Sequence, residues 1–128
     1  METDPVRTAE ADLVALSDAL TRPQPRECLF CFVDRMLVAF GCDCTLRWAR
    51  RWRDQRLPRA TGLERRLGRS GALCDCEVFL NGWTVRADLC VLDEDGYDDW
   101  PPERPACTGV GSRSSQPCAT WVPRKRGW

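Results

Sequence analysis

The sequence contains no histidine, which removes several kinds of chemistry at once. Catalytic triads that use His, acid–base catalysis by an imidazole and mixed Cys/His zinc sites are all excluded. Any zinc site must therefore be built from cysteine, with Asp or Glu as the other available ligands. No carboxylate pair, phosphate-binding loop or nucleophile–base arrangement argues for an enzyme either, so we expect a protein without catalytic activity.

Long apolar runs and net charge are also missing. No stretch approaches the roughly 18–20 apolar residues that a membrane-spanning helix needs. The first residues, METDPVRTAEADLV, are acidic and lack the basic-then-apolar pattern of a secretion signal. Lys and Arg total 19, as do Asp and Glu, so the overall charge indicates no class of partner. We expect a cytoplasmic protein with no membrane contact.

Cysteine, in contrast, is abundant, with nine residues among 128. In an oxidising compartment such a content indicates a disulfide scaffold. In the reducing cytoplasm it indicates metal binding or thiol chemistry. Because nine is an odd number, complete pairing within one chain is excluded.

Hydrophobic periodicity predicts a mainly α-helical chain with one small β-hairpin, a small α+β fold. Three or four helices are expected, over 8–20, 29–40, 44–56 and 59–70. The second is apolar on almost all faces, which is typical of a central, buried helix. In residues 76–87, CEVFLNGWTVRA, the dipeptide Asn81–Gly82 predicts a type I′ turn between two short strands.

The chain divides into three predicted parts. Residues 1–25 form an N-terminal helix and a proline-containing linker, and residues 26–92 form a cysteine-rich helical core with the hairpin. Residues 93–128 begin with an acid run and continue as a Pro-, Gly- and Ser-rich stretch without periodicity. This composition predicts a disordered C-terminal tail.

The spacing of the cysteines predicts a metal site. Cys28 and Cys31 lie at i and i+3 at the start of the central helix, and Cys74 and Cys76 lie at i and i+2 in a predicted strand. Both spacings direct two sulfurs to one side. The four thiolates suit tetrahedral zinc, with Zn–S distances of about 2.3 Å. The alternates are Cys42 and Cys44, so six candidates compete for four positions.

Two other interpretations of the cysteines stay open. Free cysteine is among the most buried residue types, so these side chains can simply be small core residues. A C-x-x-C at a helix start also suits a thiol redox protein or sensor, although the thioredoxin-like pair follows a strand in a βαβ unit, which is absent here. An iron–sulfur cluster ranks below zinc because no ferredoxin spacing is present.

A basic segment supports a different hypothesis. Between Asp43 and Ser70, nine arginines face three acids, a local net charge of +6. A basic helix face can engage phosphate backbones, so nucleic-acid binding through Arg47, Arg50 and Arg51 is the alternative function. A solvated helix face is the favoured interpretation, since the whole chain is neutral.

Three motifs resemble a known family. They are CLFC at 28–31, GCDCTLRWARRW at 41–52 and GALCDCEVFLN at 71–81. Together they resemble small bacterial proteins, common in actinobacteria, that share domain of unknown function 2695, over about residues 26–83. The family pattern has an early cysteine pair, a central CD-x-TLR and a late G-x-x-CDCEV. The cysteines that match it are Cys28, Cys31, Cys42, Cys74 and Cys76, whereas the position of Cys44 varies.

The resemblance implies no established activity, but it supports residues 26–83 as the structural unit. Our first hypothesis is therefore a small cytoplasmic protein with a structural all-cysteine zinc site. A zinc ion held by four cysteines is coordinatively closed, which favours a binding or regulatory module with an unidentified protein partner. Nucleic-acid binding and thiol redox sensing are the two alternatives.

Overall fold

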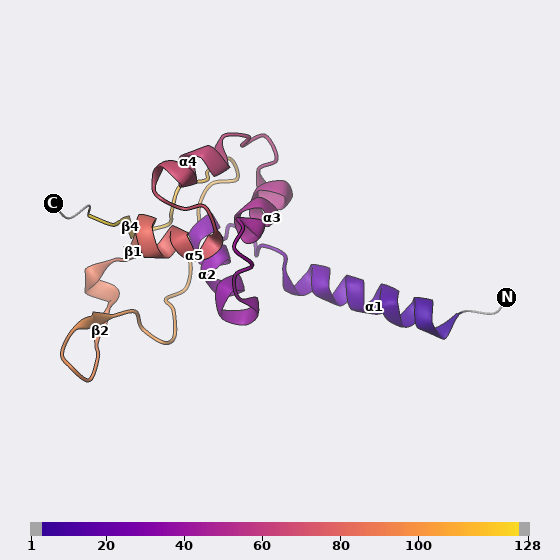
Figure 1. Cartoon of the computed structure of the whole chain (residues 1–128), viewed down its shortest axis with the longest axis horizontal. Coiled ribbons are helices and arrows are strands. Elements are labelled where there is room, and N and C mark those ends of the chain that lie inside the picture. Colours follow the sequence, from indigo (N-terminus) through magenta and orange to yellow (C-terminus); the bar gives the residue numbers. More distant parts are fainter. Residues whose placement is uncertain (1–3, 126–128) are drawn as a thin grey trace.

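Residues 4–125 are described by a computed structural model, shown in Figure 1. The prediction of a mainly helical small α+β fold is confirmed. The described helices are α1 (Pro5–Leu20), α2 (Leu29–Phe40), α3 (Arg47–Arg56), α4 (Leu63–Arg69) and the single turn α5 (Asp75–Glu77). Two small antiparallel sheets pair β1 (Trp83–Val85) with β4 (Trp121–Pro123) and β2 (Val91–Leu92) with β3 (Asp98–Asp99).

Helix α2 lies at the centre of the core, as its nearly continuous apolar sequence predicts. Its buried apolar side chains are Leu29, Phe30, Phe32, Val33 and Met36. Helix α3 packs against it through Trp48, Ala49 and Trp52. Each buried indole N–H has an acceptor, since Trp48 Nε1 donates to the Gly41 carbonyl at 2.9 Å and Trp52 Nε1 donates to the Glu27 carbonyl at 3.1 Å. A buried tryptophan keeps its hydrophobic gain only when this N–H is bonded.

Helix α1 extends away from the rest of the molecule (Figure 1). Asp4 caps its first turn by accepting from the N–H of Val6, and none of its residues is buried. Its apolar stripe, which includes Leu13 and Leu16, therefore faces solvent. The helix is attached at its last turn, where Arg51 of α3 bonds to the Asp18 carboxylate at 2.6 Å. Among the described helices, none combines the length and apolarity that crossing a bilayer requires.

The predicted hairpin at Asn81–Gly82 is wrong. Residues 75–82 form α5 and a π-helical turn, and β1 pairs with the distant β4. A type I′ turn needs positive φ at both central residues, and neither Asn81 nor Gly82 has one. The neighbours Val78 and Phe79 are both buried, which a helical turn allows and an alternating strand does not. The amide of Asn81 instead donates to the Gly71 carbonyl at 2.9 Å.

The predicted disordered tail is also corrected, except for residues 126–128, which lie outside the described part. Trp121 packs against Phe79 and Trp100, with ring centroids 4.9 and 5.2 Å away. Arg104 forms an ion pair with the buried Asp34 of α2 at 3.0 Å. The acid run makes the turn between β2 and β3, where the Asp93 carboxylate accepts from two backbone N–H groups. A few well-placed aromatic and charged side chains therefore order a segment that has no hydrophobic period.

The packing of Trp121 predicts a large effect of its removal. Trp121 is 4% exposed, so Trp121→Ala should lower the free energy of unfolding by about 3–5 kcal/mol through lost burial and the remaining cavity. Urea denaturation of the full chain measures this. Tyr97→Ala in the same segment is the control, because Tyr97 is 72% exposed and should change stability by less than about 0.5 kcal/mol. Equal, small effects of both substitutions would contradict a packed C-terminal segment.

Candidate metal centre

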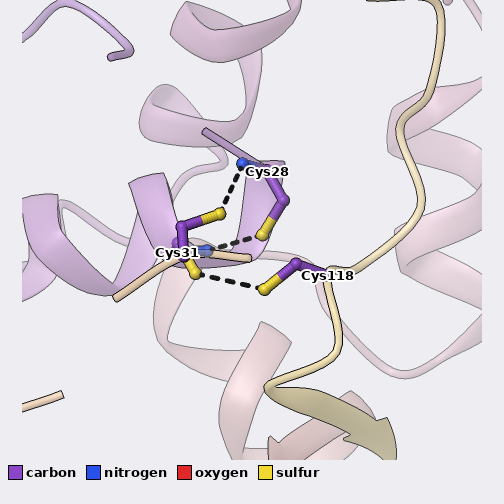
Figure 2. Close-up of side chains that lie close together, drawn as sticks. Cys28, Cys31 and Cys118 are labelled. Atoms are coloured by element: carbon purple, nitrogen blue, oxygen red, sulfur yellow. Dashed lines mark hydrogen bonds between the residues drawn. The ribbon is translucent and has the colours of Figure 1, made fainter. Parts of the chain in front are cut away.

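Four cysteine sulfurs meet beside the start of α2. They belong to Cys28, Cys31, Cys107 and Cys118, and all four lie within 4.8 Å of one another. We call this set the four-cysteine centre. Figure 2 shows the side chains of Cys28, Cys31 and Cys118 converging, two from α2 and its cap and one from the C-terminal segment. All nine cysteines of the chain lie in the described part and are free thiols.

The first pair is positioned by the start of α2. Cys28 is the N-cap, with extended backbone, and its sulfur accepts the N–H of Cys31 at 3.3 Å. A capping side chain folds back over the first turn, where residue i+3 also points. The predicted C-x-x-C geometry is therefore present, with both sulfurs on one side of the helix start.

The second pair comes from the C-terminal segment. The Cys107 sulfur accepts the N–H of Cys28 at 3.3 Å and that of Gly109 at 3.4 Å. The Cys118 sulfur lies 3.6 Å from the Cys31 sulfur, which also accepts the indole N–H of Trp121 at 3.2 Å. The centre thus joins cysteines up to 90 positions apart in the sequence.

Hydrogen bonds within the centre favour the thiolate form of Cys28 and of Cys118. A hydrogen bond from the Cys31 thiol, opposed by burial, lowers the pKa of Cys28 to about 6. The same hydrogen bond, together with burial, raises the pKa of Cys31, since Cys31 then serves as the proton donor. Burial raises the pKa of Cys107. Burial also opposes ionisation of Cys118, but hydrogen bonds from Thr120 and Thr108 outweigh it and lower the pKa of this thiol.

The donor set suits a thiophilic cation. In a tetrahedral zinc–thiolate site the sulfurs lie about 3.8 Å apart, as follows from Zn–S bonds of about 2.3 Å. The Cys31–Cys118 separation of 3.6 Å agrees with this value, and the 4.8 Å limit on all pairs requires only small adjustments. The N–H groups that point at these sulfurs offset part of the charge that four thiolates would carry.

The predicted ligands Cys74 and Cys76 lie elsewhere. They flank Asp75 at the start of α5 and lie near Cys42, which precedes α3. The structure therefore brings Cys28 and Cys31 together with Cys107 and Cys118, and it gathers Cys42, Cys74 and Cys76 separately. The alternate Cys44 is exposed. Sequence reasoning missed Cys107 and Cys118 because both fall in the segment predicted to be disordered.

The buried Asp75 fixes the position of the second cysteine set. Its carboxylate accepts the N–H groups of Trp48 at 2.9 Å and Ala49 at 3.1 Å, and so caps the start of α3 from a distant part of the chain. Its own N–H donates to the Thr45 carbonyl at 3.1 Å. Burial raises the pKa of Asp75 in spite of these N–H donors. This side chain ties α5 to the loop before α3.

The three arginines of the nucleic-acid hypothesis all make contacts within the chain. Arg47 stacks on the Trp48 ring at 4.2 Å and donates to the Gly41 carbonyl at 3.1 Å. Arg50 pairs with Glu64 of α4 at 3.3 Å. Arg51 attaches α1, as described above. These contacts give the three side chains structural roles, and nucleic-acid binding stays a prediction.

Residues 29–81 match the family model described as "Protein of unknown function (DUF2695)". This segment belongs to the DUF2695 family. Comparisons with curated proteins and with solved structures found no match. The DUF2695 segment contains Cys42, Cys74 and Cys76, but of the four-cysteine centre it contains only Cys31. The centre therefore joins the DUF2695 segment to residues on both sides of it.

Replacement of Asp75 tests its capping role. Asp75→Asn keeps the shape of the side chain, but its amide NH2 then faces a backbone N–H and one hydrogen bond is lost. We therefore expect a loss of about 1–3 kcal/mol in unfolding free energy. Asp43→Asn is the matched control, because Asp43 has the same Cys neighbours but is exposed and accepts from the N–H of Thr45. It should cost less than about 1 kcal/mol. Urea denaturation compares the two, and equal losses would contradict the role assigned to Asp75.

Proposed function

We propose that the four-cysteine centre binds a structural zinc ion and that the protein acts as a binding or regulatory module in the cytoplasm. The observation that carries this proposal is the convergence of four sulfurs within 4.8 Å from opposite ends of the chain. A reducing compartment keeps thiols free to bind metal, which is consistent with the cytoplasmic location.

Zinc suits this donor set better than other common cations. Four thiolates without oxygen or imidazole donors exclude magnesium and calcium, which prefer oxygen. Zinc accepts a tetrahedral set of four thiolates without a redox change. Iron and copper(I) also bind thiolates, and metal analysis of the purified protein distinguishes them from zinc.

The place of the centre supports a structural role. It links the start of α2 to a C-terminal segment whose described part, up to residue 125, has only two short strands as regular structure. A metal clip between residues that distant removes much of the conformational freedom of the unfolded chain, so its binding energy becomes folding energy. Four protein ligands leave no open coordination position for a substrate, which argues for a non-catalytic ion.

The test compares single cysteine variants of the full chain purified with zinc present. Cys118→Ser and Cys107→Ser should each lower the zinc content by one ion per chain and lower the thermal unfolding midpoint. Removing the metal from the wild type with a chelator should cost about 4 kcal/mol of stability, if zinc is present at about a thousand times its dissociation constant. Plasma mass spectrometry and circular dichroism give the two readouts.

The matched control is Cys90→Ser. Cys90 is half-buried like Cys107, but its thiol donates weakly to the carbonyls of Val85 and Arg86 and belongs to neither cysteine set. This variant should keep the wild-type zinc content. A Cys118→Ser protein that retains all its zinc, or a metal-free wild type of unchanged stability, would overturn the proposed function.

A further inference from the structure

The sequence contains the triplet Cys-Asp-Cys twice, at 42–44 and at 74–76. The structure places the two triplets against each other. The N–H of Asp75 donates to the carbonyl of Thr45, the residue that follows the first triplet, and the Asp75 carboxylate caps α3 immediately beyond it. Three hydrogen bonds from one fully buried residue therefore hold the second triplet beside the first.

The two aspartates leave the sulfurs as the free donor atoms. The Asp75 carboxylate is directed at the backbone of α3, and the Asp43 carboxylate accepts the N–H of Thr45 at 3.0 Å in its own loop. Both carboxylates thus shape the backbone around the cysteines. Neither is free to compete with sulfur for a cation.

The sulfur of Cys42, in the first triplet, is the one that lies beside the cysteines of the second triplet. It accepts the N–H of Cys44 at 3.4 Å, and the thiols of Cys74 and Cys76 lie near it. Backbone N–H groups directed at sulfur stabilise a thiolate, which is the form that binds a metal.

We propose that the two triplets form a second metal site, in which Cys42, Cys74 and Cys76 bind a zinc ion and Cys44 supplies the fourth thiolate. The thiols of Cys74 and Cys76 both lie near the Cys42 sulfur, and the three sulfurs must draw closer together than the 4.8 Å mutual separation of the four-cysteine centre to hold one ion. Cys44 is exposed two positions from Cys42, in a left-handed conformation with φ of 69°. A change of its side-chain rotamer, together with closer approach of the other three sulfurs, completes a tetrahedral set.

This second site differs from the four-cysteine centre in accessibility and in location. The centre contains two buried cysteines, whereas the triplet cysteines are half-buried or exposed. An ion at the triplets is therefore expected to exchange with chelators faster than the ion in the centre. All four triplet cysteines also lie inside the DUF2695 segment, so this site is complete without the C-terminal segment.

Cobalt(II) titration of the reduced, metal-free full chain tests the proposal, because bonds between thiolate and cobalt absorb in the near ultraviolet. The wild type should bind two equivalents. Cys42→Ser should abolish the equivalent at the triplets and leave the one at the four-cysteine centre. Cys118→Ser should abolish the equivalent at the centre and leave the one at the triplets. The Cys90→Ser control should keep both. Cys44→Ser should retain the second ion but lose about a quarter of its charge-transfer absorbance, since one of four thiolates is gone.

A second measurement needs no variant. In the zinc-loaded wild type, alkylation by N-ethylmaleimide followed by peptide mass spectrometry should find Cys42, Cys74 and Cys76 protected and Cys90 modified. A mild chelator should expose the triplet cysteines before those of the four-cysteine centre. This readout is independent of any folding defect in the serine variants.

Three results would overturn the second site. The first is a wild-type titration that ends at one equivalent, which Cys118→Ser then abolishes. The second is a Cys42→Ser protein that keeps both equivalents. The third is alkylation of the triplet cysteines as fast as Cys90 in the zinc-loaded protein. Failure of the four-cysteine centre gives a different pattern, a single equivalent that Cys42→Ser abolishes and Cys118→Ser leaves unchanged. The two proposals can therefore fail separately.

Discussion

The contact between the start of α2 and the C-terminal segment is the constraint on which the rest of the structure depends. Backbone groups make part of it, since the N–H of Val110 donates to the Arg26 carbonyl at 3.0 Å. Side chains make the rest, through the ion pair of Asp34 with Arg104 and the indole N–H of Trp121 on the Cys31 sulfur. The central helix thereby becomes enclosed by residues that follow it by 70 positions or more.

Regular secondary structure alone does not hold this segment. Strands β1 and β4 pair over three residues, and an isolated two-stranded sheet is marginal in water. The four-cysteine centre adds a further difficulty, because a thiolate at Cys28 repels ionisation of its neighbour Cys31. A bound divalent cation would remove that repulsion and let all four thiols ionise together. The same ion would then stabilise the enclosure of α2.

The sequence predicted the parts of the fold that depend on neighbours along the chain. The apolar run of α2 and the sulfurs of Cys28 and Cys31 on one side of its start follow from helical spacing alone. The failures all involve distant partners. Asn81–Gly82 favours a hairpin locally, but the pairing of β1 with β4 prevails. Cys107 and Cys118 gave no local signal, since their roles depend on aromatic packing at Trp121.

The sequence contains no histidine, so no imidazolium can stabilise a thiolate in this protein. Backbone N–H groups take that role in both cysteine sets. Cys28 caps α2, where the free N–H groups of the first turn and the helix dipole favour negative charge. Cys42 lies just before α3, and its sulfur receives the N–H of Cys44. Because Asp75 already occupies the first N–H groups of α3, the thiolates there depend on loop N–H donors and, in our proposal, on the cation itself.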